Sequence, residues 1–282
     1  MSTPLTLQRD ASVTIDTVQT RRGVRAALRV RPEQARGSVV LVPGFTGSKE
    51  DFLTLLPLLG AAGWHVLAYD HLGQYQSPGT DVVADYSIDL LAADLLDIVA
   101  TMPAPVHVVG HSFGALVTST AVIADPAVFV SVTVLSCGLV PLQGGLASAL
   151  EQLLAIPDGT PTTTVWAVRR QLEGPLDPSL PPDIAAFVEQ KFVASPLAAL
   201  KGKASGLLTT HDLTAALAGT PGPFLVATGA LDDYWPLTQQ QAVAEALGTE
   251  LVLFEGCGHS CAVDDPSAVA AEFDRFWTTS HS

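Results

Sequence analysis

The residues best suited to chemistry form a Gly-x-Ser-x-Gly pentapeptide, Gly-His-Ser-Phe-Gly, at 110–114. A β-branched run beginning at Val106 precedes it, and small and apolar residues at helical spacing follow it. This context predicts a strand, a tight turn and a helix, with the hydroxyl of Ser112 exposed on the turn at the start of the helix. Because a Cβ at Gly110 or Gly114 would crowd the strand against the helix, both glycines fit such a turn.

Two further reactive groups occur where later strands are expected to end. Asp232 and His259 each follow a short apolar run, and the chain order Ser112, Asp232, His259 suits a serine nucleophile on an α/β sheet. A serine hydroxyl becomes nucleophilic when a base takes its proton and an acid orients that base. We therefore expect Ser112 as nucleophile, His259 as base and Asp232 as orienting acid. The neighbouring Asp233 is the alternative acid.

Strands that alternate with helices would position these groups. The run at 38–43 is rich in β-branched residues without polar alternation, which is typical of a strand buried on both faces. The alternation of strands and helices that follows implies a parallel sheet with helices on both faces. The first two strands are expected to form an antiparallel hairpin at a sheet edge. Strands are predicted at 12–18, 24–30, 38–43, 64–69, 106–110, 130–136, 223–228 and 250–254, and helices at 49–61, 87–101, 112–124, 236–247 and 266–278.

The alternation is interrupted between residues 137 and 213. Helical patterns are predicted there at 145–155, 161–172, 182–194 and 196–201, with no convincing strand. We expect a core made of 1–136 and 214–282, and a helical lid at 137–213 over the carboxyl ends of the strands, where ligands of open α/β sheets bind. A separate helical domain elsewhere on the surface is the alternative.

These motifs resemble those of the α/β-hydrolase superfamily, in particular its serine esterase and lysophospholipase-like branch with a helical cap. The resemblance extends from about residue 36 to residue 278. The Gly-x-x-Asp-x-x-x-Pro loop of that family is matched by Gly229, Asp232 and Pro236, and its Gly-x-Gly-His loop by residues 256–259. The resemblance implies an α/β-hydrolase fold, with a mostly parallel eight-stranded sheet, helices on both faces and a helical lid insertion.

An oxyanion hole requires two backbone N–H groups directed at the developing alkoxide. The residue after the nucleophile, Phe113, is expected to supply one of them. The resemblance assigns the other to Phe45, in the loop after the strand at 38–43. This sequence has Pro43 where the family usually has His, so the loop must be anchored differently.

Four aromatic or imidazole side chains are candidates for the substrate pocket. His71 and Tyr75 occur in a loop that resembles the family's Asp-x-Arg-Gly-x-Gly-x-Ser segment, with Leu72 in place of Arg. Trp166 and Trp235 are candidates for an apolar acyl pocket. Turn formation and ordinary core packing are the alternative roles for these residues.

Composition restricts the partners. The chain has 282 residues, a net charge of −14, 48% hydrophobic residues and 15% charged residues, which indicates a globular protein and disfavours nucleic acid as a partner. The uncharged stretch 126–150 is interrupted by Pro and Gly, and no signal peptide is evident, so we expect a cytoplasmic protein without stable membrane insertion. Cys257 and Cys261 flank His259, but no further ligand pair has metal spacing, so we expect neither metal nor cofactor.

The residues therefore predict a serine hydrolase that cleaves a carboxylic ester (or lactone) of a small to medium apolar substrate through an acyl-enzyme intermediate. A small-molecule ester is the expected partner, and the oligomeric state is open. An acyltransferase or thioesterase of a biosynthetic pathway would use the same nucleophile with a different acceptor. A non-catalytic ligand-binding protein on the same fold is a further alternative.

Overall fold

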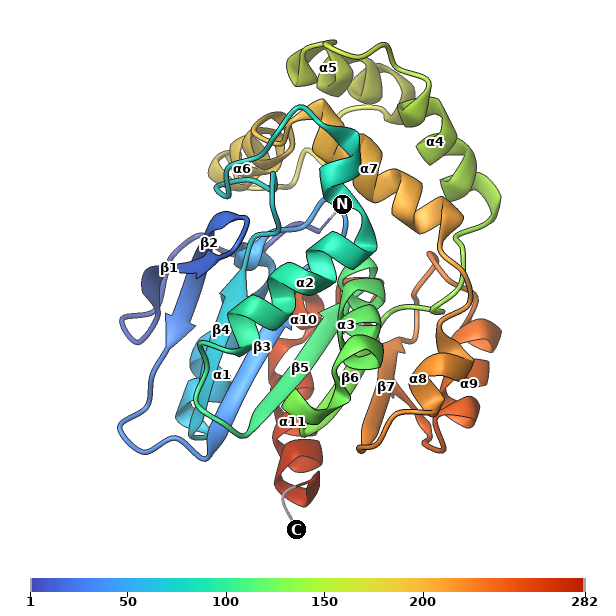
Figure 1. Ribbon diagram of the computed structural model, residues 1–282. Helices are drawn as coiled ribbons and strands as arrows, with labels where there is room; N and C mark the ends of the chain where they lie inside the picture. The colour runs from blue at the N-terminus through green and yellow to red at the C-terminus, as the bar shows by residue number, and fades with distance from the viewer. Residues whose placement is uncertain (1, 281–282) are drawn as a thin grey trace.

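A twisted sheet of eight strands, ordered β1-β2-β4-β3-β5-β6-β7-β8, forms the centre of the computed structural model, which describes residues 2–280 (Figure 1). The pairs β1–β2 and β2–β4 are antiparallel, and the other five pairs are parallel. The strands are β1 (Thr14–Thr20), β2 (Gly23–Val30), β3 (Gly37–Val42), β4 (Trp64–Tyr69), β5 (Val106–His111), β6 (Ser131–Leu135), β7 (Phe224–Gly229) and β8 (Leu251–Phe254). The predicted mostly parallel sheet and its antiparallel edge hairpin are confirmed.

Helices cover both faces of the sheet because its central strands β3, β4, β5 and β6 are mainly apolar and are buried along their whole length. One face packs against α2 (Ile88–Val99), α3 (Phe113–Ala124), α8 (Thr214–Ala218) and α9 (Leu237–Ala246). The other face packs against α1 (Leu55–Ala61), α10 (Cys261–Asp264) and α11 (Pro266–Ser280). Short 3₁₀ helices occur at η1 (Lys49–Phe52), η2 (Val83–Tyr86) and η3 (Pro126–Val128).

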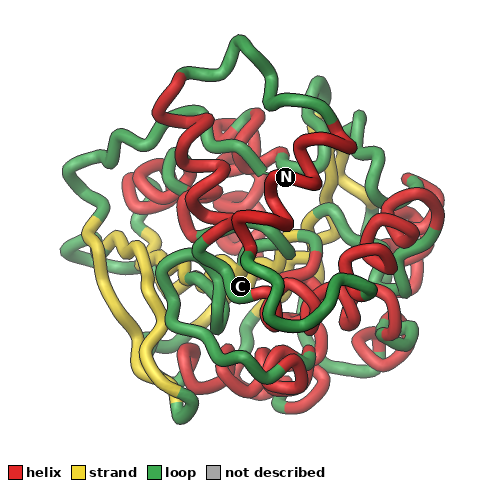
Figure 2. The backbone as a smooth tube through the Cα atoms, turned by 90° about the horizontal axis from the view of Figure 1, so that it is seen from above, coloured by secondary structure: helices red, strands yellow, loops and turns green. Residues whose placement is uncertain are grey.

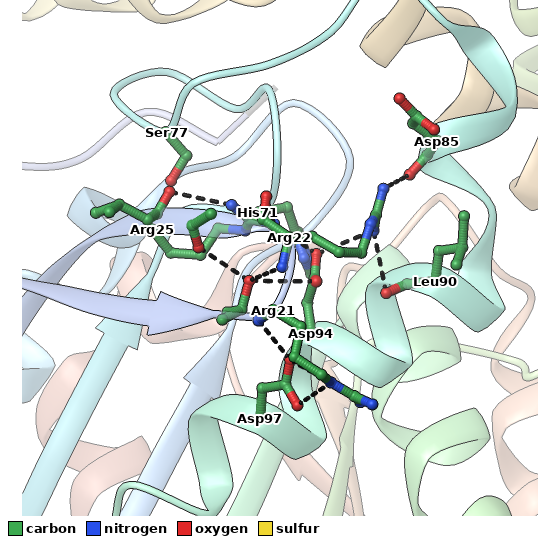
Figure 3. A network of polar contacts seen from close by, with 12 residues as sticks. Arg21, Arg22, Arg25, His71, Ser77, Asp85, Leu90, Asp94 and Asp97 are labelled. Carbon is green, nitrogen blue, oxygen red and sulfur yellow. Dashed lines mark hydrogen bonds and ion pairs between the residues drawn. The ribbon is translucent and has the colours of Figure 1, made fainter.

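The edge hairpin is fixed to α2 by a group of arginine–aspartate contacts (Figure 3). The buried guanidinium of Arg25 lies 2.8 Å from Asp94, which also accepts from Arg22 at 3.1 Å. On the more exposed side, Arg21 pairs with Asp97 at 2.8 Å. These contacts neutralise the carboxylate of Asp94 inside the protein, where an unpaired charge would be strongly destabilising.

Helices α4 (Gly144–Leu154), α5 (Thr162–Glu173), α6 (Pro182–Val193) and α7 (Leu197–Thr209) come between β6 and β7 in the chain. They lie above one end of the sheet in Figure 1, and Figure 2, which views the molecule from that side, shows helices and loops over the strands. An apolar cluster that includes Trp166, Phe187 and Phe192 joins α5, α6 and α7. The division of the chain at residues 137 and 213 stays a prediction.

The predicted helix boundaries are wrong in two places. The helix expected at 49–61 is divided into η1 and α1, and the helix expected at 196–201 continues to Thr209. A glycine at 202, just after the expected end, would ordinarily weaken a helix interior. At Gly202, however, a Cβ would lie 2.6 Å from the Cβ of Tyr86, so glycine lets α7 pack closely on η2. The short helices α8 and α10 were not predicted, because they have too few residues to show a period.

Helix α7 also carries a buried lysine. The side chain of Lys203 is fully buried, and its Nζ has no hydrogen-bond partner among the described residues. Burial lowers the pKa of Lys203 from 10.5 to about 7, although the carboxylate of Asp70 opposes this change. Because the unfolded chain keeps the higher pKa, it binds more protons than the folded protein between these values, and folding becomes more favourable as the pH rises.

We predict that Lys203→Met stabilises the protein more at neutral than at alkaline pH. Wild type should become more stable as the pH rises, whereas the variant has no buried amine to deprotonate. The difference in the free energy of unfolding between variant and wild type, measured by urea unfolding, should therefore decrease by up to about 4 kcal/mol between about pH 7 and about pH 10. Lys201→Met is the matched control, because Lys201 on the same helix bonds to Asp158 at 2.6 Å. Parallel pH dependences of wild type and Lys203→Met would contradict the prediction.

Candidate active site

Ser112 occupies the sharp turn between β5 and α3. Its φ of 54° and ψ of −122° lie outside the regions that L-residues favour, and its backbone N–H donates to Leu135 O at 2.8 Å. A Cβ at Gly114 would lie 2.3 Å from Val42 O, and one at Gly110 would lie 2.3 Å from Thr118 Oγ1. The two glycines therefore permit the turn that presents Ser112, as the sequence predicts.

The loops after β7 and β8 bring a carboxylate and an imidazole together. Nδ1 of His259 lies 2.9 Å from Oδ1 of Asp232. That carboxylate also accepts hydrogen bonds from Tyr234 N at 2.9 Å, from Thr228 Oγ1 at 2.9 Å and from Gln240 Nε2 at 3.3 Å. Asp232 is thus the carboxylate that contacts the imidazole, whereas Asp233 beside it is exposed.

Burial by itself would raise the pKa of Asp232, but its hydrogen bonds outweigh this effect. The interaction with His259 contributes most, and the N–H of Tyr234 and the hydroxyl of Thr228 contribute further, so the pKa is lowered below 3.8. The carboxylate therefore stays ionised at neutral pH, although it is buried. Thr228 and Gln240 were not singled out from the sequence, since neither belongs to a motif.

One cavity of about 550 Å³ contains both Ser112 and His259 in its wall. Since Nδ1 of His259 faces Asp232, its Nε2 is on the opposite side of the ring and is available to a second group. The rest of the wall is mainly aliphatic and includes Leu142, Leu146, Leu150, Leu153, Ile156, Val165, Val168, Leu172, Leu207 and Val263. Leu146, Leu150 and Leu153 are spaced by four and three residues along α4, so the sequence alone could have indicated an apolar helix face at this wall.

The charged groups of the cavity wall have partners. Asp51 pairs with Lys191 of α6 at 3.3 Å, Arg169 pairs with Glu173 at 2.9 Å, and Asp264 accepts from the N–H of Gly258 at 2.8 Å. Asp51 belongs to η1 and Lys191 to α6, so this almost fully buried pair also joins the two helices. The wall therefore suits a largely uncharged ligand.

The loop after β3 lies against the serine. A Cβ at Gly44 would lie 3.3 Å from Ser112 Cβ, and Phe45 next to it lines the cavity. Phe113 is the first residue of α3, where a backbone N–H has no acceptor within its own helix. Both candidate oxyanion residues are therefore close to Ser112. Phe45 follows Gly44, which lies against the serine, and Phe113 follows the serine in the sequence.

The side chains of His71 and Gln74 bond to backbone carbonyls of the loop after β3. Nε2 of His71 lies 3.2 Å from Pro43 O, and Nε2 of Gln74 donates to Gly44 O at 2.8 Å. Burial, with a smaller contribution from Lys203, lowers the pKa of His71 to about 3, so its ring is neutral and donates to the carbonyl. These bonds hold the loop that has Pro43 in the place of the family's usual histidine.

Of the four pocket candidates, only Trp235 is in the cavity wall. His71 is buried beneath the loop that it anchors, and Tyr75 packs edge-on against Phe187 with its ring centroid 4.9 Å from Lys49 Nζ. Trp166 packs against Phe192 in the cluster of α5, α6 and α7. The contacts of His71, Tyr75 and Trp166 therefore fit the alternative roles, which are turn formation and core packing.

The cysteines are free, buried thiols. Burial raises the pKa of Cys137 and Cys261 to about 12, so neither is an anionic ligand at neutral pH. Across residues 2–280, no group of three or more His, Cys, Asp or Glu side chains is arranged to hold a metal ion. No helix in the same range has the length and apolar character to cross a membrane.

Comparison with known proteins gives consistent matches. Residues 39–272 match the model of the alpha/beta hydrolase family. A relative from Variovorax paradoxus (strain S110), provisionally named carbamate hydrolase RutD, is 28% identical over 252 residues, which cover 84% of this chain and 89% of the relative. A relative of the same name from Pseudomonas savastanoi pv. phaseolicola is 30% identical over 239 residues, 81% of this chain and 88% of the relative.

A solved structure from a study of carboxylesterases of the ammonia-oxidizing thaumarchaeon Nitrososphaera gargenis has a TM-score of 0.74 at 17% identity. The match covers 94% of this chain and 99% of that one, and it shows a shared fold.

We predict that Gly114→Ala lowers the free energy of unfolding by about 3 kcal/mol, because the added Cβ would meet backbone atoms that cannot move aside. Urea unfolding measures the change. Gly145→Ala is the control, since a Cβ at this helical position has nothing within 4 Å, and it should leave stability unchanged or raise it by up to about 1 kcal/mol. Equal effects of the two substitutions would contradict this account of the turn.

Proposed function

The chain belongs to the alpha/beta hydrolase family, and on this basis we propose that it is a serine hydrolase that cleaves a carboxylic ester (or lactone) with an apolar acyl group. One observation carries the proposal. Ser112, on its strained turn, and His259, bonded to Asp232, line the same largely aliphatic cavity. Nucleophilic catalysis by serine requires a hydroxyl and a base at one site, with the base oriented by a third group.

In the first half of the proposed reaction, Oγ of Ser112 attacks the carbonyl carbon while Nε2 of His259 takes the hydroxyl proton. The backbone N–H groups of Phe45 and Phe113 bind the resulting oxyanion. Asp232 keeps the proton on Nδ1 and stabilises the imidazolium. When the tetrahedral intermediate collapses, the carbon–oxygen bond to the alcohol breaks, and His259 gives its proton to the leaving alcohol.

The second half regenerates the enzyme. Water attacks the acyl-enzyme carbonyl as His259 takes one of its protons, and the second tetrahedral intermediate expels Ser112, which recovers its proton from His259. The carboxylic acid then leaves. An alcohol or amine in the place of water would give the acyltransferase reaction by the same steps. In the thioesterase reaction, the substrate is a thioester, so a thiol leaves in the first half and water still attacks the acyl-enzyme.

The helices α4–α7 are proposed to act as the lid that selects the substrate. A cavity of about 550 Å³ lies within the range that holds a whole small-molecule ligand. Its aliphatic wall comes largely from α4 and α5, and the buried Asp51–Lys191 pair holds α6 to the core. These features favour an uncharged ester of small to medium size.

Carbamate hydrolysis is the second candidate, because the two relatives carry that name. A carbamate also has a carbonyl carbon that Ser112 could attack. The aliphatic wall and its paired charges favour an ester with an apolar acyl group over a small carbamate. The two candidates therefore differ in the group that the lid accepts and share the same nucleophile.

We predict a burst of nitrophenol when the protein is mixed with a p-nitrophenyl ester, equal in amount to the active sites, followed by a slower steady state. Ser112→Ala should abolish the burst and lower kcat/KM by about 10⁴-fold or more. Stopped-flow absorbance measures both phases. A p-nitrophenyl hexanoate should acylate the protein faster than a carbamate with the same leaving group, because the cavity is apolar.

Ser119→Ala is the matched control for this experiment. Ser119 is a fully buried serine on α3, seven positions further along the chain, and it does not line the cavity. Its variant should keep the burst. An undiminished burst from Ser112→Ala would refute the proposal, and faster acylation by the carbamate would favour the second candidate.

A further inference from the structure

The imidazole of His259 is stacked on the ring of Tyr234. The two ring centroids are 3.8 Å apart, and the planes differ by only 9°. Trp235 is more distant, with its centroid 6.1 Å from the imidazole, and His111 approaches at 5.0 Å with a tilt of 47°. Tyr234 is therefore the one ring among these that covers a face of the imidazole at contact distance.

Tyr234 also reaches the acid. Its backbone N–H donates to Oδ1 of Asp232 at 2.9 Å, and this same oxygen lies 2.9 Å from Nδ1 of His259. A single residue thus contacts the carboxylate through its backbone and the imidazole through its side chain. Because the loop from Asp232 to Trp235 makes both contacts, the plane of the imidazole is set by the same segment that holds its acid.

The face of a phenol ring carries partial negative charge, so it attracts a cation placed above it more strongly than a neutral group. In the proposed reaction, the imidazole becomes positively charged when it takes the proton of Ser112. The stack with Tyr234 therefore strengthens as the reaction approaches the tetrahedral intermediate. An interaction that is stronger in the transition state than in the free enzyme accelerates the chemical step.

We propose that Tyr234 is a positioning residue that fixes the plane of the His259 imidazole and stabilises its protonated form through the face of its ring. The proposal rests on the function proposed above, in which His259 is the base. Burial raises the pKa of Tyr234, with a smaller opposing contribution from Arg169, so the hydroxyl stays uncharged at neutral pH. The ring face, and not a phenolate, is the group that acts.

Several titratable groups face the stack or line the cavity beside it, and every Tyr234 variant retains all of them. They are Asp232 and Asp233 from the loop after β7, His111 from β5, Asp264 from α10, Arg169 and Glu173 from α5, and Asp51 from η1. Burial, followed by the nearby His259, lowers the pKa of His111 to about 4. His111 therefore stays neutral above about pH 5 and adds no change of charge beside the stack above that pH.

The experiment compares Tyr234→Leu, which removes the aromatic face, with Tyr234→Phe, which keeps it. The dependence of kcat/KM on pH is measured with a p-nitrophenyl ester from about pH 5 to about pH 8. For Tyr234→Leu we expect the plateau to fall about tenfold and the midpoint of the acid limb to move about half a pH unit lower. The sign follows because the variant loses a group that favours the protonated imidazole. Tyr234→Phe should stay within about twofold of wild type, with an unmoved midpoint.

A purely structural role would lower the plateau of Tyr234→Leu without moving the midpoint, and that result would overturn the proposal. A Tyr234→Phe variant that behaves like Tyr234→Leu would also overturn it, because the hydroxyl would then be the active group. Circular dichroism checks that the variants fold, and Tyr234→Met replaces the leucine variant if that one does not.

A titration that needs no turnover separates this proposal from the proposed function. The ring proton of His259 is followed by NMR in wild type and in Tyr234→Leu, with His259→Gln used to assign the signal. A lower midpoint in Tyr234→Leu supports the stacking effect even if no ester is cleaved, in which case the proposed function alone fails. Equal midpoints in the two proteins overturn the stacking effect even if esters are cleaved.

Discussion

The hydrogen bond between Asp232 and His259 is the interaction on which the rest of the site depends. It joins loops after two neighbouring parallel strands, β7 and β8, so the twist and register of the sheet determine whether it can form. Burial raises the pKa of the carboxylate, yet the interaction with His259 and the hydrogen bonds from Tyr234 and Thr228 outweigh this effect, and it therefore remains a charged partner for the imidazole. Close packing contributes as well: a Cβ at Gly229 would lie 2.1 Å from Gly258 O, so the two loops approach each other only because this position lacks a side chain.

The surroundings of the site are held by polar contacts that the motifs do not include. His71 and Gln74 fix the loop that carries Phe45, and Lys191 fixes α6 to Asp51. None of these three side chains takes part in the proposed reaction. Together they keep the loop that contains Gly44 and Phe45 against Ser112 and keep α6 on the core. A preorganised site of this kind needs little rearrangement when charge develops on a substrate oxygen.

Much of this organisation could be predicted from the sequence, because several residue types are compatible with few backbone arrangements. Gly110 and Gly114 indicated the sharp turn, and the β-branched runs indicated the buried strands, which the structure has within one or two residues of the predicted ends for most of the sheet. The length of α7 and the positions of His71, Tyr75 and Trp166 depend on tertiary packing, so no local pattern revealed them. The same is true of Tyr234, whose importance appears only when its ring is seen against the imidazole.

The most direct test of the account is covalent labelling with a fluorophosphonate, which reacts with a serine hydroxyl only when a neighbouring base activates it. We expect mass spectrometry to find one label per chain, on the peptide that contains Ser112, with labelling slowed at least about a hundredfold in His259→Gln. Labelling that is absent, that occurs on another residue, or that proceeds equally fast in His259→Gln would contradict the claim that these side chains act together.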